Sequence, residues 1–236
     1  MKNSVFLRFI REMPEEARVA AIVTLTKMST NEEDYTVLWS SANLVEVLTE
    51  LSKDKYWKVR REVAENPATP AKILEQLSED EEEIVRWNVA KNQKTPAEVL
   101  TELSKDKYWK VRREVAENPA TPAKILEQLS EDEDEVRSAV AGNPRTPPAV
   151  LTELSKDKYW KVRFEVAVNP ATPAEVLTKL SKDKDEEVRS AVAANPATPA
   201  EVLTKLSKDK DEKVRCNVAV NSCYAKFKFS KRINNF

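Results

Sequence analysis

Apolar residues recur along this chain at the spacing of short helices, in a unit that is repeated many times. Each unit contains the dipeptide Val-Arg, and successive copies of the dipeptide are separated by 26, 26, 25, 26, 26 and 26 residues. A unit of this length cannot bury its apolar face alone, and stacking against neighbouring units supplies the missing core. The pattern therefore predicts a solenoid of about seven 26-residue repeats. The arginines of the dipeptide are Arg60, Arg86, Arg112, Arg137, Arg163, Arg189 and Arg215.

The first half of each repeat opens with Thr-Pro and continues with apolar residues at helical spacing, such as Val176, Leu177 and Leu180. Threonine caps helix N-termini, and proline suits the first helical position because no backbone N–H is needed there. A glutamate stands three residues after the threonine in several repeats, which predicts a capping box. These threonines are Thr95, Thr172 and Thr198.

The second half of each repeat carries the Val-Arg dipeptide and predicts a second, shorter helix. Val59 and Val63 are four residues apart, so both lie on one helix face. Asn-Pro then ends the helix in most repeats, because proline removes a donor and holds its predecessor in extended geometry. The one missing residue falls between Asp132 and Val136, where we expect a loop. With no strand signal, these features predict an all-α solenoid of two-helix repeats.

The repeated pattern VRxxVAxNPxTPxEVLxxLxxD resembles the leucine-rich repeat variant family over residues 43–221. The resemblance implies a right-handed solenoid whose repeats pair an α-helix with a short helix, α or 3₁₀. It implies a fold rather than a function. Some members carry a cysteine-rich iron–sulfur segment, and this chain lacks those cysteines.

The two ends depart from the repeat, as the ends of a solenoid must in order to cover its terminal faces. We interpret residues 1–42 as degenerate repeats that form an N-terminal cap, with Val37 in a core position, Asp34 in place of the arginine, and Ile22 and Leu25 in the leucine positions. Residues 222–236 form a basic, aromatic tail. It is either a terminal cap or loosely held end, which is the favoured reading, or an arm for nucleic acid.

Composition excludes several kinds of function. The chain of 236 residues has no histidine, which rules out Ser-His-Asp catalysis and histidine-ligated metals, and its one glycine rules out a phosphate-binding loop. Cys216 and Cys223 are too few for a zinc site, leave a disulfide between them open, and fit a reducing cytoplasm. The net charge of −1 indicates no membrane or nucleic-acid preference. We therefore expect no enzyme, cofactor or metal site.

Two positions differ between repeats, while the valines, the arginine and the asparagine stay nearly constant. One follows the arginine and the other precedes the asparagine, so they share a helix face, which we call the variable face. Variable exposed residues on a constant scaffold are typical of repeat proteins that bind a protein or peptide. The alternative is neutral drift, with Trp87 and Phe164 filling grooves between helices. The candidate binding residues are Arg61, Glu65, Trp87, Lys91, Arg113, Glu117, Phe164 and Val168, with ion pairs expected for Arg61–Glu65 and Arg113–Glu117.

A second pattern has a period of two repeats. A Tyr-Trp pair flanked by lysines precedes alternate Val-Arg dipeptides, and its tryptophans are Trp57, Trp109 and Trp160. Such a stripe suits base stacking, which makes a nucleic-acid-binding solenoid the alternative function, but packing on the neighbouring turn is the favoured reading. Residues 46–81 also recur unchanged as residues 98–133, which indicates recent expansion or deliberate construction.

The constant arginine has an aspartate six residues before it, as in Asp54 with Arg60 and Asp80 with Arg86. A row of arginines suits phosphate binding, but recurrence together with an acid favours a structural ladder of hydrogen bonds along the solenoid. We expect the constant asparagines to satisfy backbone groups at the turns in the same way.

Overall fold

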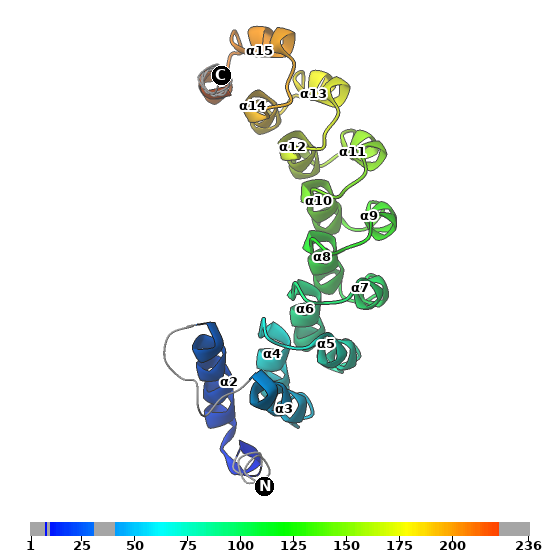
Figure 1. The fold of residues 1–236 in the computed structure, drawn as a ribbon. Helices are drawn as coiled ribbons and strands as arrows, with labels where there is room; N and C mark the ends of the chain where they lie inside the picture. Colours follow the sequence, from blue (N-terminus) through cyan, green and yellow to red (C-terminus); the bar gives the residue numbers. More distant parts are fainter. Residues whose placement is uncertain (1–7, 9, 31–40, 222–236) are drawn as a thin grey trace, which may run out of the picture. The chain divides into compact units, whose positions relative to one another are not determined.

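The computed structural model describes residues 8, 10–30 and 41–221, and every regular element in that part of the chain is a helix (Figure 1). Each repeat contributes two helices, as predicted. We call them the Val-Arg helix and the Thr-Pro helix. The Val-Arg helices are α4 (Trp57–Glu65), α6 (Glu83–Lys91), α8 (Trp109–Glu117), α10 (Asp134–Gly142), α12 (Trp160–Val168) and α14 (Glu186–Ala194). The Thr-Pro helices are α5 (Ala71–Leu77), α7 (Ala97–Leu103), α9 (Ala123–Leu129), α11 (Pro148–Leu154), α13 (Ala174–Leu180) and α15 (Ala200–Leu206).

The chain divides into two compact units, Met1–Thr121 and Pro122–Phe236. In the first unit, α4 packs against α6 and α6 against α8. In the second, α10 packs against α12 and α12 against α14, and residues 212–221 add a further helical segment. Within each unit the Thr-Pro helices lie to one side of the row of Val-Arg helices (Figure 1). This consecutive packing is that of an α-helical solenoid.

The core lies between the two rows of helices. Val59 and Val63 on α4 and Leu74 on α5 are fully buried, and the corresponding valines and leucines are buried in the other repeats. Val176, Leu177 and Leu180 are likewise buried, as their spacing predicts. Each helix is too short to be stable alone, so its stability comes from this shared apolar layer.

The predicted capping boxes are not formed. The N-cap of each Thr-Pro helix is the proline, without a side-chain cap, as at Pro96. The threonine before it is buried and its hydroxyl donates to a carbonyl near the end of the preceding Val-Arg helix, as Thr95 does to Val89. Carbonyls at a helix C-terminus lack partners within the helix. The threonine therefore serves the end of one helix rather than the start of the next.

The relative lengths of the two helices also differ from expectation. The Val-Arg helices have nine residues and the Thr-Pro helices seven, so the second helix of a repeat is the longer one. The Thr-Pro helix ends early because a serine closes its last turn. Ser78, for example, donates its hydroxyl to the carbonyl of Glu75 and its backbone N–H to that of Leu74.

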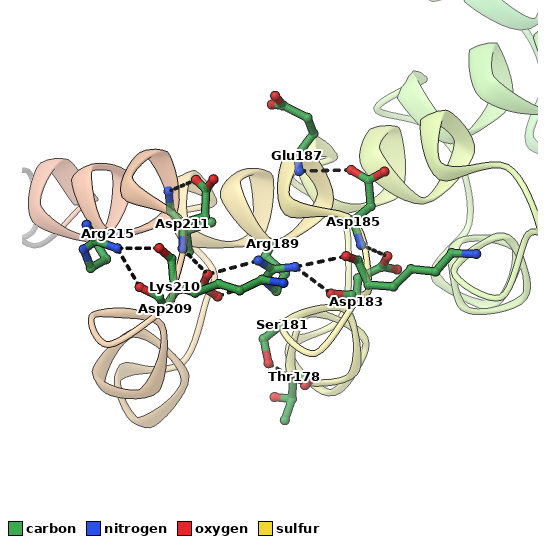
Figure 2. Close-up of polar contacts among 12 residues, drawn as sticks. Thr178, Ser181, Asp183, Asp185, Glu187, Arg189, Asp209, Lys210, Asp211 and Arg215 are labelled. Atoms are coloured by element: carbon green, nitrogen blue, oxygen red, sulfur yellow. Dashed lines mark hydrogen bonds and ion pairs between the residues drawn. The ribbon is translucent and has the colours of Figure 1, made fainter.

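The constant arginines join consecutive repeats. Arg189 donates Nε and Nη2 to the carboxylate of Asp209 in the next repeat, at 2.8 and 3.0 Å, and Nη1 to the carbonyl of Asp183 in its own repeat (Figure 2). The same arrangement links Arg60 to Asp80 and Arg163 to Asp183. The aspartate six residues earlier therefore offers its carbonyl, and its carboxylate receives the arginine of the preceding repeat. Further arginine–carboxylate pairs are Arg86–Asp106 and Arg137–Asp157, while Arg112 and Arg215 donate to the carbonyls of Asp106 and Asp209.

The missing residue lies in the four-residue turn between α9 and α10, in the loop that the spacing predicts. The arginine after this turn keeps its carbonyl contact. Arg137 donates Nη1 to the carbonyl of Asp132, which is five residues earlier rather than six, at 2.6 Å. The ladder thus tolerates a one-residue deletion because only the turn has to adjust.

Asparagines form a second ladder at the other end of the Val-Arg helices. Asn169 donates Nδ2 to the carbonyls of Ala141 and Asn143 in the preceding repeat, at 2.7 and 2.8 Å, and its side-chain oxygen accepts from Ala171. Asn92, Asn195 and Asn221 make the same inter-repeat contacts. These buried amides satisfy backbone groups at every turn, as expected from their position.

At the N-terminal side, α2 (Glu15–Thr30) packs against α4, and α3 (Ser41–Leu51) precedes it. Arg18 on α2 is buried and pairs with Asp54 at 2.9 Å, so it gives the first repeat the carboxylate contact that ladder arginines give later repeats. Ile22 is buried, whereas Asp34, Val37 and the side chain of Leu25 lie outside the described residues. The ladder therefore begins from α2.

The ladder yields a direct test by substitution. Burial acts to raise the pKa of Asp183, but the hydrogen bonds from Arg163 and from the backbone of Asp185 and the charge of Arg163 outweigh it and lower this pKa. Arg163→Ala leaves this buried carboxylate unpaired, and we expect it to cost about 3 kcal/mol of unfolding free energy. Urea unfolding at pH 7 measures the cost.

Arg215→Ala is the matched control. Arg215 has the same place in its repeat but is exposed, so its loss is expected to cost less than about 1 kcal/mol. Equal costs for the two variants contradict a stabilising role for the arginine–carboxylate pair.

Candidate functional site

The variable face is exposed along one of its two rows. The residue before the asparagine is exposed in every repeat, including Glu65, Lys91, Glu117 and Val168. The residue after the arginine is closer to its neighbours, because Arg61, Trp87 and Phe164 are half-buried, Arg113 is exposed and Ser190 is buried. The outer row is thus available to a partner, and the inner row also packs between helices.

The two expected ion pairs on this face have different outcomes. Arg113 pairs with Glu117 at 2.7 Å, and both side chains are more than two-fifths exposed, so the pair contributes only a few tenths of a kcal/mol. Arg61 does not pair with Glu65. Its guanidinium contacts the carboxylate of Glu62 and lies 5.9 Å from the ring centre of Trp57. The ion pair with Glu62, beside the indole ring, holds Arg61 away from the expected partner.

Trp87 contacts residues on two helices. On its own helix, α6, the ammonium of Lys91 lies 4.9 Å from the centre of the indole ring. Across the groove, hydrogen bonding from the indole acts to lower the pKa of Glu114 on α8, against the larger effect of burial. Trp87 therefore has part of the groove-filling role that the drift alternative assigns to it, while its outer edge stays accessible.

A pocket of about 340 Å³ lies between α6 and α8 on this face. Aromatic residues form much of its wall, and charged residues of both signs surround them. It is lined by Glu83, Ile84, Trp87, Tyr108, Trp109, Lys110, Val111, Arg113 and Glu114. A concave site with aromatic walls and few convergent polar groups is the usual form of a binding pocket.

Glu114 is the buried charged residue of this pocket, and sequence reasoning missed it. It is only 8% exposed, and burial is the main reason that its pKa is raised, with the charge of Glu117 adding to the effect. A glutamate stands at this place in each Tyr-Trp repeat, as Glu62, Glu114 and Glu165, whereas other repeats have asparagine or alanine. Because this glutamate and the Tyr-Trp pair recur with the same two-repeat period, the sequence does contain a signal that the two act together.

In the second unit, the variable face is apolar on α12. Trp160 and Phe164 meet edge to face, with ring centres 6.3 Å apart, and Val168 continues the same helix face at 49% exposure. The neighbouring α10 ends at Gly142, where a Cβ atom would lie 3.2 Å from a carboxylate oxygen of Glu165. The absent side chain at Gly142 therefore leaves room for Glu165 beside this apolar ridge.

The tyrosine rings of the Tyr-Trp stripe lie next to lysine and arginine side chains of the same chain. The rings of Tyr56, Tyr108 and Tyr159 are more than a third exposed, and each lies 4.8–5.1 Å from the ammonium of the lysine before it. The arginine of the preceding layer also lies over each tyrosine ring. These arginines are Arg18, Arg86 and Arg137, at 5.3, 5.6 and 6.0 Å. The tyrosines of the stripe thus lie against arginines of the ladder, while Trp160 of the same stripe is exposed.

Other kinds of site have no candidate in the part of the chain that the structure describes. No group of three or more acidic or cysteine side chains is placed to hold a metal ion there. Within the same residues, no helix is long and apolar enough to cross a membrane. Cys216 is exposed, while Cys223 and the tail of residues 222–236 lie outside the described residues.

Comparison with known families identifies the repeat. Two family models match, the leucine rich repeat variant over residues 57–82 and the leucine rich repeat variant domain over residues 110–157 and 163–222. Together they cover more than half of the chain. A search of curated proteins found no match.

Solved structures with the same architecture include a leucine-rich repeat variant protein with a repetitive structural motif. It is 27% identical to this chain and superposes on it with a TM-score of 0.62. The alignment covers 93% of this chain and 82% of that protein. The E. coli protein YibA is 18% identical to this chain, with a TM-score of 0.50. The alignment covers 93% of this chain and 96% of YibA. The second likeness shows the fold alone.

The buried carboxylate of Glu114 yields a prediction about pH. Because folding raises its pKa above the ordinary value of 4.5, the ionised form disfavours folding at neutral pH. Glu114→Gln keeps an acceptor for the indole N–H and is expected to raise the unfolding free energy at pH 7. The difference from the parent protein should shrink as the pH falls through the raised pKa and vanish below 4.5.

Urea unfolding of both proteins between pH 4 and pH 8 measures this difference. All other titrating groups are common to the pair, so they cancel. A Glu114→Gln variant that is less stable than the parent at every pH contradicts the assignment of an unfavourable buried charge.

Proposed function

The chain belongs to the leucine-rich repeat variant family, and we propose that it is a non-catalytic scaffold that binds a protein or peptide through its variable face. The observation that carries the proposal is the contrast between constant and variable positions. The valines of the core and the arginines and asparagines of the ladders are nearly the same in all repeats. The exposed positions beside them change in size, charge and polarity.

The chemistry of the variable face supports binding. In the first unit it presents Trp87 beside Lys91 and Arg113 beside Glu117, and a pocket opens beside them. In the second unit it presents the ridge of Trp160, Phe164 and Val168. Tryptophan and arginine are enriched among residues that dominate binding energy at interfaces, and exposed apolar ridges mark contact sites.

A nucleic-acid-binding solenoid is the alternative, and the exposed tyrosines beside lysines at every second repeat favour it. Against it, those rings already contact lysine and arginine side chains of the same chain, and the net charge is −1. Binding through such a stripe and the tail of residues 222–236 requires affinity that falls steeply with salt. The protein or peptide reading therefore has the stronger support.

Two further proposals concern the whole chain. Residues 1–42 act as the N-terminal cap of the solenoid, which the pairing of Arg18 with Asp54 supports. The protein works in the cytoplasm, where its two cysteines stay reduced, because secreted proteins that need disulfides use more of them.

The proposal is tested by capture from a nuclease-treated lysate of the source organism on the immobilised protein. Trp87→Ala and Phe164→Ala remove one large side chain from the variable face of each unit. We expect at least one of them to reduce recovery of a bound protein tenfold or more, as loss of an interface anchor does. Circular dichroism checks that all variants are equally helical.

Glu102→Ala and Glu153→Ala are the matched controls. Both glutamates are exposed on Thr-Pro helices and pair only with lysines three residues away, so their loss should leave recovery unchanged. Recovery that survives both face substitutions rejects the variable face as the binding site. Recovery of nucleic acid alone, when nuclease is omitted, supports the alternative function.

A further inference from the structure

The first unit contains one nine-residue helix twice. The helices α4 and α8 both have the sequence WKVRREVAE, and their N-cap residues are the equivalent tyrosines Tyr56 and Tyr108. The side chains of the two copies are nevertheless arranged differently. Since the copies are identical, the difference arises from their surroundings, because α4 packs against α2 and α6, whereas α8 has α6 as the helix before it.

In the α4 copy, the chain supplies its own cation to the glutamate. The guanidinium of Arg61 contacts the carboxylate of Glu62, whose side chain is 13% exposed, and also stacks over the ring of Trp57. The indole face and the carboxylate together form a half-cage for a planar cation. An arginine occupies it because a guanidinium both stacks on aromatic rings and donates to a carboxylate.

In the α8 copy, the corresponding cation is absent. Arg113, the counterpart of Arg61, turns outward and pairs with Glu117 at 2.7 Å. The carboxylate of Glu114 makes no ion pair with a basic group of the described residues, and Arg113, Lys91 and the indole of Trp87 offset only part of the rise in its pKa. A carboxylate that is only 8% exposed and makes no ion pair is costly to ionise, even though the charges of Arg113 and Lys91 act on it from a longer distance, so a cation that binds it directly would be favourable.

The pocket of about 340 Å³ lies in front of this carboxylate. Trp87 and Trp109 both line it, with the ammonium groups of Lys91 and Lys110 4.9 and 5.9 Å from their ring centres, and Tyr108 extends the aromatic lining. The charged residues of the lining are Glu83 and Glu114 with Lys110 and Arg113, and Arg113 is already paired with Glu117. The pocket therefore combines aromatic rings with a buried carboxylate that makes no ion pair, which suits a planar cation.

We infer that the pocket between α6 and α8 binds an arginine side chain of the protein or peptide partner, with the guanidinium between Trp87 and Trp109 and hydrogen-bonded to Glu114. The inference rests on the proposed partner-binding function and names the chemistry that this site recognises. The occupied copy at α4 shows the corresponding indole and carboxylate, Trp57 and Glu62, contacting an arginine of the chain itself. Arginine fits better than lysine because its flat, weakly hydrated head group stacks on indole.

The test uses the ¹⁵N-labelled full chain and Nα-acetyl-arginine amide as the probe. The chain has five tryptophans, and each gives its own indole N–H signal in an NMR spectrum. The signals of Trp87 and Trp109 should shift together along one saturable curve with a Kd on the order of 1 mM, as expected for a single side chain. Glu114→Gln should weaken this binding at least tenfold, and the signal of Trp57 should not respond.

Arg61→Ala is the matched variant, because it empties the equivalent half-cage on α4. The signal of Trp57 should then begin to respond to the probe, while Trp87 and Trp109 respond as before. Nα-acetyl-lysine amide is the competing probe and should bind at least fivefold more weakly. Equal or tighter binding of the lysine probe, or unsaturable shifts at Trp87 and Trp109, overturns the arginine assignment.

The outcome separates this inference from the proposed function. If the arginine probe fails to bind but Trp87→Ala or Phe164→Ala still abolishes capture of a partner, the scaffold function stands and the arginine assignment falls. If the probe binds as predicted but both face variants keep their partner, the pocket is real and the variable face is not where the partner docks.

Discussion

The ion pair between the arginine of one repeat and the aspartate of the next determines how the repeats join. Apolar burial holds the helices together, but it has no direction and does not by itself fix one register. The guanidinium of the arginine does fix the register, because it donates both to the carboxylate of the next repeat and to a backbone carbonyl of its own repeat. Arg163 shows this with Asp183 and Asp157. The turn with one residue fewer keeps the same contacts, so register is set by the ladder rather than by loop length.

Because the core and the ladders hold the repeats together, the exposed positions are free to vary in sequence. The ladders and the core occupy the faces of the Val-Arg helices that meet their neighbours, and the exposed outer row of the variable face contributes little to stability. The identical helices α4 and α8 show how one residue of the variable face on a neighbouring helix, Trp87, changes the surface beside them. Trp87 on the preceding helix binds Glu114 and adds a wall, and a pocket exists at the second copy of the sequence.

Most of the fold and part of the site follow from the sequence. The period, the stop at Asn-Pro and the loop deletion are local features with a direct physical reading. The role of Thr95 was predicted wrongly because two neighbouring helix ends compete for one hydroxyl, and only packing decides between them. Glu114 was missed because its importance depends on Trp87, 27 residues earlier, and on a groove that exists only after the helices stack.

Hydrogen exchange of the protein with and without its bound partner tests the central claim most directly. If an inner ladder holds the scaffold and the variable face binds, amides of α6, α8 or α12 exchange more slowly in the complex. The Thr-Pro helices α5, α7, α11 and α13 then exchange at unchanged rates. Protection confined to the Thr-Pro helices would contradict the account, because the partner would then lie on the side whose residues repeat rather than vary.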